Sequence, residues 1–423
     1  MPSDVAIAAV IFLITYGLIA SDRINKTIVA LLGGLAMIIF RVIDQDEAFL
    51  AVDFNVIFLL AGMMVLAGIL RRTGFFQWVA IRSIKIAGGH PFRLMIVLSV
   101  VTAIMSALLD NVTTVVLIAP VTLSIASILG VAPIPFLVAE ILAANIGGTA
   151  TLIGDPPNIL IGSASGLDFV AFLANMGPVA LMVFVAFIVT LRVLFGGKLT
   201  VAPDAREAAL GLDERDVIAD PVLLRRSLVV IAATLVGFLL HGPLGYQPAT
   251  VALLGATILM LIAGLDPESV FREVEWPTLF FFVGLFILVE GVVRVGIIQA
   301  MADGLFSLTG GDETVTTIGL LWLSGLASGI VDNIPYTATM IPLVRDLGAA
   351  GLAIEPLWWA LAMGADFGGN ATIIGASANV VVANLADRAG QKITFRAFLP
   401  YGALLVLESL VIATIYMWVR YLG

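Results

Sequence analysis

The chain has 423 residues, of which 61% are hydrophobic and only 12% are charged, and its formal net charge is −9. A single soluble core could not bury this much apolar surface, so the composition excludes an ordinary soluble domain and indicates an integral membrane protein. Cysteine is absent and the two histidines, His90 and His241, fall at predicted helix ends, which argues against thiolate or histidine metal sites. We therefore expect no metal and no cofactor.

The first half of the chain predicts five membrane crossings and one hairpin. Apolar runs predict the crossings, at residues 5–20, 27–43, 54–70, 134–163 and 169–191. The first run follows Asp4 with no preceding Lys or Arg, so we interpret it as an uncleaved helix and not a signal peptide. Segment 94–129 has two apolar arms around a polar Asp110-Asn111 tip, which is typical of a re-entrant hairpin. Residues 1–195 form the predicted N-terminal repeat.

The crossing at 134–163 is interrupted near its middle. Residues that weaken a helix gather there, namely Gly147, Gly148, Gly154, Pro156 and Pro157. Irregular backbone at membrane depth is tolerated only where it is buried in protein or lines a cavity. Close packing through small residues is the alternative, but packing alone does not require Asp155 and two prolines. The pattern predicts a broken helix at a binding site.

A charged linker separates this half from a second one. Residues 196–226 mix basic and acidic side chains, and we predict that this linker lies in the cytoplasm. Five further crossings and a second hairpin follow in a C-terminal repeat, 227–423, with crossings at 227–241, 248–264, 277–293, 356–385 and 398–419 and the hairpin at 315–350. The predicted fold class is an all-α polytopic membrane protein with about ten transmembrane helices and two re-entrant hairpins.

The two halves are internal repeats. At an offset of 222 residues, matching positions include Val29 to Gly33 with Val251 to Gly255, Gly62 with Gly284, Asp110-Asn111 with Asp332-Asn333, and Pro120 with Pro342. At an offset of 221, Gly147 to Gly154 match Gly368 to Gly375, and Asn158 matches Asn379. A shared offset across several segments is hard to obtain by chance.

Loop charges indicate that the repeats are inverted. Residues 71–93 contain five basic side chains and no acid, so the positive-inside rule places them in the cytoplasm. The equivalent residues 294–315 contain one Arg and three acids, which indicates the opposite side. Equivalent loops on opposite sides require inverted repeats with an odd number of crossings. This topology predicts external N- and C-termini in the cell inner membrane.

Polar residues at the tips and breaks define a candidate substrate or ion site between the repeats. Charges at bilayer depth cost on the order of 2.5–3.5 kcal/mol each, so each one is a functional candidate. The proposed binding residues are Asp110, Asn111, Thr113, Asn145, Gly148, Thr149, Thr151, Asp155, Asn158, Asp332, Asn333, Thr337, Asp366, Asn370, Thr372 and Asn379. The candidates for proton coupling are Asp110, Asp155, Asp332, Asp366 and Glu290. The alternatives are helix capping for the tip residues and, for Glu290, pairing with Arg294.

The predicted site is not symmetric in its acids. Asn145 aligns with Asp366, whereas Asp155 aligns with Ala376. Each broken helix therefore keeps one carboxylate, at a different level. Substrate and proton can compete for such a carboxylate, which is the minimal requirement for proton antiport.

The segments Leu109 to Asn111 and Gly147 to Asn158 resemble those of the arsenite permease and NhaD-type sodium/proton antiporter families of the ion transporter superfamily. The resemblance covers both halves of the chain. It implies a scaffold built from the first two helices of each repeat and a mobile unit containing the hairpins and broken helices. It also implies an elevator motion, often in a homodimer, and leaves open whether a soluble ATPase subunit takes part.

The substrate expectation follows from the resemblance and from charge. Dicarboxylate symporters of the same superfamily carry Ser-Asn-Thr tips, whereas this chain carries acids at Asp110 and Asp332, which would repel a carboxylate substrate. We expect proton-coupled efflux of arsenite or antimonite, held through oxygen contacts because cysteine is absent. The alternative is sodium/proton exchange. No nucleic-acid partner is expected.

Two other classes of protein are alternatives to a secondary transporter. An intramembrane aspartyl protease could use Asp155 and Asp332 as a dyad, but peptide hydrolysis gives no use to the repeated Asn, Thr and Pro residues. A passive channel would show steady uncoupled flux in vesicles. The repeat favours a transporter and not an enzyme.

Overall fold

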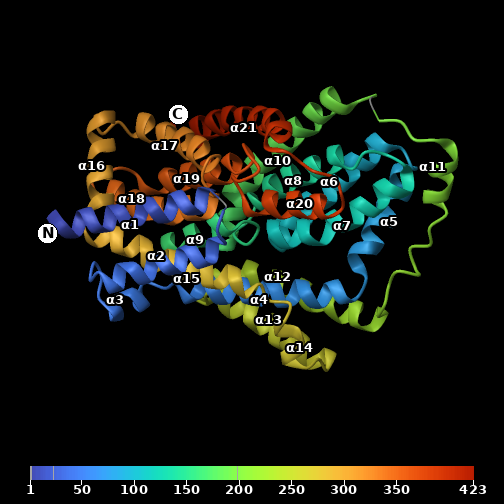
Figure 1. Cartoon of the computed structure of the whole chain (residues 1–423), viewed down its shortest axis with the longest axis horizontal. Helices are drawn as coiled ribbons and strands as arrows, with labels where there is room; N and C mark the ends of the chain where they lie inside the picture. The colour runs from blue at the N-terminus through green and yellow to red at the C-terminus, as the bar shows by residue number, and fades with distance from the viewer. Residues whose placement is uncertain (1, 22, 198) are drawn as a thin grey trace.

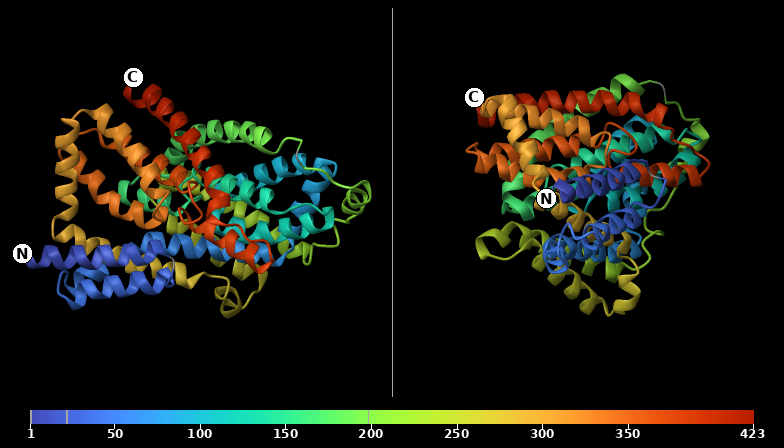
Figure 2. Two further views of the ribbon diagram at one scale, coloured as in Figure 1. Left: turned by 45° about the horizontal axis from the view of Figure 1, so that its top comes forward. Right: turned by 60° about the vertical axis from the view of Figure 1, so that its left-hand side comes forward.

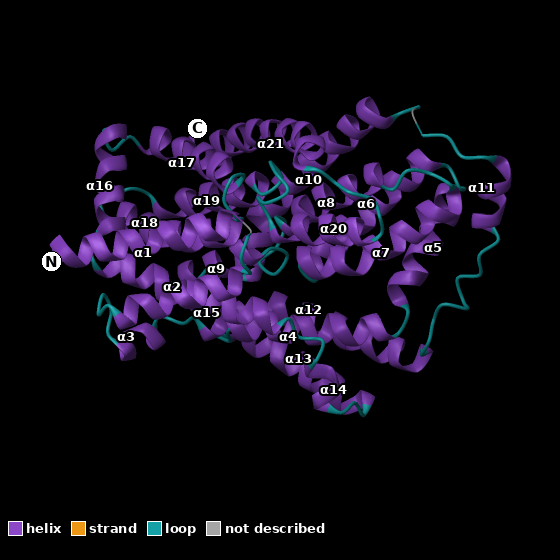
Figure 3. Cartoon of the chain, in the orientation of Figure 1, coloured by secondary structure: helices purple, strands orange, loops and turns teal. Residues whose placement is uncertain are grey.

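The computed structural model describes residues 2–21, 23–197 and 199–423, and within these ranges it contains helices and connecting loops but no strand (Figures 1 and 3). The first half contains α1 (Pro2–Ser21), α2 (Lys26–Ile39), α3 (Gln45–Leu50), α4 (Phe54–Arg72), α5 (Phe75–Ala87), α6 (Pro91–Leu108), α7 (Asn111–Leu129), α8 (Ile134–Gly148), α9 (Pro156–Ser165) and α10 (Phe169–Phe195). The linker contains α11 (Pro203–Leu210). The predicted all-α fold is confirmed.

The second half repeats the first helix by helix. It contains α12 (Pro221–Leu244), α13 (Pro248–Ala263), α14 (Pro267–Phe271), α15 (Trp276–Arg294), α16 (Ile297–Thr309), α17 (Glu313–Ser328), α18 (Asn333–Ala349), α19 (Ile354–Gly368), α20 (Ser377–Arg388) and α21 (Phe395–Met417), followed by a π-helical turn, Trp418–Leu422. Helices α1 to α10 thus correspond in order to α12 to α21.

Several short helices were not predicted from the sequence. The most informative are α5 and its counterpart α16, which lie at opposite ends of the molecule (Figure 1). On α5, the side chains of Phe76, Ala80, Ile84 and Ala87 are buried along one face, so the helix is amphipathic. Its charged residues made the segment resemble a loop in the sequence. Equivalent helices at opposite ends agree with an inverted arrangement of the two halves.

A scaffold forms where α2 packs on α15 and α4 packs on α13. Small residues permit these close crossings, as expected for helices in a membrane. A Cβ atom built on Gly284 would lie 2.5 Å from the backbone carbon of Ala30, and one on Gly62 would lie 2.8 Å from that of Ala252. These two contacts are repeat equivalents. We use the name scaffold for α1, α2, α4, α12, α13 and α15.

A second group of helices forms what we call the hairpin unit. It consists of α6 to α10 and α17 to α21. Helix α6 packs on α8, and α17 packs on α19, within each half. Across the halves, α7 packs on α20 and α18 on α9. The two halves are therefore interlocked in this unit, through helices on either side of the chain breaks after α8 and α19.

Eight helices in the described part of the chain are long and apolar enough to cross a membrane, namely α1, α4, α6, α7, α10, α12, α15 and α21 with its terminal turn. Helices α2 and α13, predicted as crossings, are shorter, at 14 and 16 residues. Helix α2 ends at Ile39, earlier than the predicted 43, because Arg41 adopts a left-handed conformation with φ of 59°. The predicted broken crossings appear as α8 with α9 and α19 with α20.

The linker is attached to α5 at the end of the molecule opposite the N-terminus (Figure 2). Glu214 forms ion pairs with Arg82 and Lys85 of α5, at 3.2 and 3.4 Å. The Arg206 Nε donates a hydrogen bond to the Gly88 carbonyl (2.8 Å), and the backbone of Ala219 donates one to that of Thr73 (3.0 Å). The linker therefore contacts α5 at both ends and along its length.

Candidate functional site

The two hairpin tips make corresponding hydrogen bonds, although their N-cap residues differ in backbone conformation, with φ of −171° at Asp110 and −45° at Asp332. Asp110 and Asp332 are the N-caps of α7 and α18, and their carboxylates accept hydrogen bonds from the N–H groups of Thr113 and Ile334. The backbone N–H of the next residue, Asn111 or Asn333, donates to a carbonyl in the chain break, 3.0 Å away in both halves. Each tip is thus bonded to the broken helix of its own repeat.

The chain breaks are held by matching bonds. In the first half, the Asn158 side chain donates to the Thr151 carbonyl at 3.1 Å, and in the second half Asn379 donates to the Thr372 carbonyl at 2.8 Å. Gly148 and Gly154 are in backbone contact, since a Cβ atom on Gly154 would lie 2.4 Å from the Gly148 oxygen. No larger residue fits there, so the glycines predicted to break the helix also allow the chain to fold back on itself.

A polar core lies between the two breaks. The Asp155 carboxylate accepts hydrogen bonds from the side-chain amides of both tips, 2.7 Å from Asn111 and 3.2 Å from Asn333. Asn145 accepts from Asn111 and donates to Asn370 and Asn379, at 3.0 and 2.9 Å. These residues are fully or almost fully buried. The core therefore joins residues from both halves through hydrogen bonds.

The acids of the core are placed unequally, as the sequence alignment predicts. Asp155 is bonded to both tips, whereas Asp366 is fully buried and, among the described residues, forms no hydrogen bond with either tip amide. Its repeat equivalent, Asn145, donates two hydrogen bonds across the interface. A carboxylate in the place of Asn145 cannot donate when ionised, so the two halves cannot make the same contacts.

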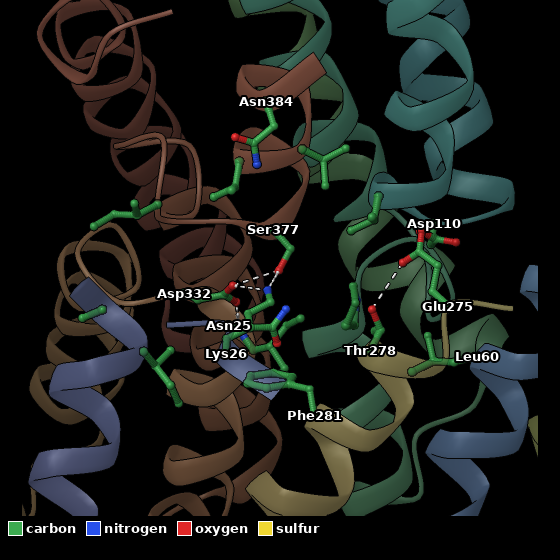
Figure 4. Close-up of a pocket in the computed structure, with 18 of the residues that line it drawn as sticks. Asn25, Lys26, Leu60, Asp110, Glu275, Thr278, Phe281, Asp332, Ser377 and Asn384 are labelled. Atoms are coloured by element: carbon green, nitrogen blue, oxygen red, sulfur yellow. Dashed lines mark hydrogen bonds and ion pairs between the residues drawn. The ribbon is translucent and has the colours of Figure 1, made fainter. Parts of the chain in front are cut away.

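A cavity of about 320 Å³ opens between the scaffold and the hairpin unit (Figure 4). Its polar lining comes from both, namely Asn25, Lys26, Glu275 and Thr278 from the scaffold and its loops, and Asp110, Asp332, Ser377 and Asn384 from the hairpin unit. Three carboxylates and one ammonium line it. This charge balance suits a cationic or neutral guest better than an anion.

One wall of the cavity is an ion-paired cluster. The Lys26 ammonium lies 3.0 Å from Asp332 Oδ2 and also donates to the Ser377 hydroxyl, which itself donates to Asp332 at 2.8 Å. The Phe281 ring lies 5.2 Å from the ammonium on its other side. The cluster joins α2 of the scaffold to α18 and α20 of the hairpin unit.

The opposite wall carries two acids. Figure 4 shows Asp110 and Glu275 side by side, with Thr278 donating a hydrogen bond to Glu275 at 3.2 Å. Within ranges 2–21, 23–197 and 199–423, neither acid forms an ion pair with a basic side chain. The two tips therefore face different electrostatic surroundings.

The structure divides the predicted site residues between the cavity and the polar core. Asp110 and Asp332 line the cavity. Asn111, Asn145, Asp155, Asn158, Asn333, Asp366, Asn370 and Asn379 are buried in the core. Thr149, Thr151 and Thr372 donate to backbone carbonyls, and the buried Thr337 hydroxyl has no hydrogen-bond partner within the described ranges. Glu290 is half-buried on α15 and lines neither this cavity nor the second cavity described below. Arg294, the partner suggested for Glu290, forms its ion pair with Glu47 at 2.6 Å.

Six polar residues of the cavity were missed in the sequence, namely Asn25, Lys26, Glu275, Thr278, Ser377 and Asn384. A repeat comparison could have found Glu275, because the offset of 222 aligns it with another acid, Asp53. It could not have found Lys26 or Ser377, whose equivalents are Pro248 and Pro156. Lys26 and Ser377 thus lie where the two halves differ, whereas Glu275 lies where both halves carry an acid.

A second cavity, of about 240 Å³, lies between α9 of the hairpin unit and the scaffold helices α4 and α12. It is lined by residues that are repeat equivalents of the first cavity's lining, including Leu59 for Phe281, Ile159 for Val380 and Ser163 for Asn384. Here Asn55 donates a hydrogen bond to Ser163, which donates one to Asp53, and none of the lysines that the structure describes lines the space. The two cavities are thus related by the internal repeat, and the charged cluster is present in one of them.

The polytopic helical fold, with polar hairpin tips and paired broken helices, defines the class of the protein as a membrane transporter. The chain belongs to the citrate transporter family, whose family model matches residues 16–364. The broader prediction of a transporter of the ion transporter superfamily is confirmed. The narrower assignment to arsenite permeases or NhaD-type antiporters stays a prediction.

Several relatives of the chain are described as transporters. An uncharacterized transporter of Mycobacterium tuberculosis is 47% identical, with 98% of both chains covered. The human P protein is 32% identical over 99% of this chain and 60% of its own length. The crystal structure of the Alcanivorax borkumensis YdaH transporter has the same fold, with a TM-score of 0.61, 15% identity, and coverage of 99% of this chain and 98% of that one. The protein is thus a transporter and not an enzyme.

Proposed function

We propose that this transporter is a proton-coupled exporter of a small neutral or cationic solute, with arsenite or antimonite as its substrate. The observation that supports this proposal most directly is the lining of the cavity between scaffold and hairpin unit. The carboxylates of Asp110, Glu275 and Asp332 face a single ammonium, and that ammonium is already paired with Asp332.

Charge argues against free citrate as the substrate, although the family is described by that name. Two like charges 4 Å apart repel by roughly 4 kcal/mol at an effective dielectric constant near 20. Citrate carries several negative charges and would meet Asp110 and Glu275 with no cation of the protein paired to either acid, among the residues that the structure describes. Arsenous acid is uncharged at neutral pH and could donate its hydroxyl hydrogens to the same carboxylates.

Sodium/proton exchange is the second candidate, and a specific feature favours it. Asp110 and Glu275 lie together on one wall with the Thr278 hydroxyl beside them. Carboxylate and hydroxyl oxygens are the ligands that a hard cation prefers. A proton or a sodium ion could alternate at this pair.

For the transport cycle, we propose that the hairpin unit moves against the scaffold. The two repeat-related cavities support this proposal, because each lies between the hairpin unit and a different part of the scaffold. Movement would close one and enlarge the other, giving access to each side in turn. In the proposed orientation, the linker 196–226 is cytoplasmic and the first cavity opens toward the cytoplasm of a cell inner membrane.

The test is transport by the purified protein in liposomes with a pH-sensitive dye inside. Under an imposed proton gradient, arsenite is expected to accumulate and to dissipate the gradient in proportion. Parallel samples receive sodium, citrate, and citrate chelated to Mg²⁺. If sodium alone dissipates the gradient, the second candidate replaces the first, and if citrate does so in either form, the charge argument is wrong.

A further inference from the structure

Lys26 occupies an unusual position for a lysine. It is the first residue of α2, where the positive end of the helix dipole disfavours a cation. Its place in the helix therefore does not explain the residue. Its side chain instead extends across the cavity wall, between the Phe281 ring and the Asp332 carboxylate.

The contacts of Lys26 cross the boundary between the two parts of the protein. Lys26 and Phe281 belong to the scaffold, whereas Asp332 and Ser377 belong to the hairpin unit. Asp332 Oδ1 caps α18, which leaves Oδ2 for Lys26 and Ser377. Any displacement of the hairpin unit relative to α2 must break this ion pair.

The internal repeat shows that the contact is not a requirement of the fold. The positions equivalent to Lys26 and Ser377 are Pro248 and Pro156, neither of which has a side-chain hydrogen-bonding group. The equivalent tip, with Asp110, keeps its capping bond and its backbone contact to the break without an ammonium. The tip can therefore be built without the lysine.

We propose that Lys26 is an internal counter-ion that holds the empty hairpin unit against the scaffold, and that it is displaced from Asp332 when the transported cation, solute or proton reaches that carboxylate. Lys26 is thus a positioning residue that prevents movement of the empty carrier. This prevention makes exchange obligatory, since a carrier that moved empty would dissipate the gradient. The inference rests on the proposed function for its role in coupling, but the ion pair itself can be tested without any substrate.

The test uses a cysteine reporter, which is unambiguous because the chain contains no cysteine. Asn384 is exposed and lines the first cavity, so Asn384→Cys is expected to react with N-ethylmaleimide. The reaction rate is measured in liposomes without substrate, for the reporter alone and combined with Lys26→Gln, Lys26→Arg or Arg23→Gln. Arg23 is exposed on the loop that precedes α2, three residues before Lys26. Its variant therefore removes one positive charge near the same place and serves as the control.

Loss of the ion pair is expected to lower the labelling rate about fivefold in Lys26→Gln, because the hairpin unit then spends less time in the conformation that exposes residue 384. Lys26→Arg and Arg23→Gln should keep the original rate. Equal rates in all four proteins would overturn the proposal, and so would an equal decrease in Lys26→Arg and Lys26→Gln, which would indicate packing and not charge.

A second measurement tests coupling. In liposomes without arsenite or sodium, proton flux through Lys26→Gln is expected to exceed that of the unmodified protein by about fivefold. If labelling changes but no substrate of the proposed classes is transported, the proposed function is wrong and the counter-ion role stands. If transport is coupled and Lys26→Gln changes neither labelling nor proton flux, the counter-ion role is wrong and the proposed function stands.

Discussion

The two hairpin tips carry the same Asp-Asn dipeptide and the same backbone bond to their broken helix, yet their carboxylates have different neighbours. Asp332 is paired with Lys26, whereas Asp110 lies beside a second acid, Glu275. The two neighbours that differ, Lys26 and Glu275, both belong to the scaffold or its loops. The comparison teaches that the repeat fixes the geometry of the site and that residues outside the repeated motif decide its charge.

The largest effect is expected when the tip acids are neutralised. Asp110→Asn and Asp332→Asn should each reduce coupled transport by at least about tenfold, because each removes a carboxylate from the cavity. Asp332→Asn should also lower thermal stability, by about 1–2 kcal/mol after allowing for solvent at the partly exposed Lys26, since it removes that residue's ionic partner. Transport in liposomes and thermal unfolding in detergent are the measurements.

Asp46 provides the control for these variants, because it is exposed on α3 and lines neither cavity described above. Asp46→Asn should leave both measurements unchanged. Equal loss of stability in Asp110→Asn and Asp332→Asn would contradict the difference between the tips.

The next effect concerns the amides behind the tips. Asn111→Ala removes a donor to both Asn145 and Asp155, whereas Asn333→Ala removes a donor to Asp155 alone. A buried group left unpaired costs about 1–3 kcal/mol, so both variants should be destabilised and Asn111→Ala should be the less stable. Thermal unfolding of the two variants in the same detergent checks the order. The reverse order would show that the polar core depends more on the second half.

A smaller effect is expected at Glu275. Glu275→Gln keeps the shape of the side chain but removes one of the two acids of its wall, so the apparent affinity for a cationic or neutral substrate should fall about three- to tenfold. Competition between substrates in liposomes measures this change. Asp53→Asn, the repeat equivalent, lies outside the first cavity and serves as its control. An equal effect of both variants would mean that Glu275 acts through the scaffold and not at the site.

The smallest effects are expected at the two hydroxyls. Ser377→Ala removes hydrogen bonds to Lys26 and Asp332, whereas Thr278→Ala removes one to Glu275. Hydrogen bonds to charged groups contribute about 1.5–3 kcal/mol when buried and less at a solvated cavity wall. We therefore expect the transport rate to fall a few fold in Ser377→Ala and about twofold in Thr278→Ala. Initial rates of arsenite uptake give the comparison. A larger effect at Thr278 would place the more important cluster at the Asp110 tip.

Much of the fold could be predicted from local signals. Apolar runs predicted the long helices. Glycines predicted the breaks at 149–155 and 369–376, and prolines added to the prediction of the first break only, because both residue types act on neighbouring backbone. Helices α5 and α16 were missed because a short amphipathic helix with charges resembles a loop. The prediction that α2 extends to residue 43 was wrong. The helix ends at Ile39 because Arg41, two residues later, has a left-handed backbone conformation.

The candidate site was predictable at the repeated motifs and at the polar residues beside them. The tips and the amides were found because the repeat places them at a constant offset. Lys26 was missed because it is distant in sequence from Asp332 and has a proline as its repeat equivalent. The division between cavity and buried core could not be predicted either, since it depends on how α9 and α20 pack against the other half.

The contacts of the linker give the two end helices unequal freedom. Helices α5 and α16 each begin and end next to glycines with positive φ, Gly74 and Gly88 for α5 and Gly296 and Gly310 for α16, which can serve as pivots. A Cβ atom on Gly74 would lie 1.9 Å from the Val217 carbonyl of the linker, whereas those on Gly296 and Gly310 would have no described neighbour within 4 Å. The hairpin unit is therefore joined to the scaffold by two helices of about 20 Å, of which α5 is held by the linker and α16 is free to rotate about its terminal glycines. Cutting the linker would release α5 and make the two connections more alike in their freedom to move.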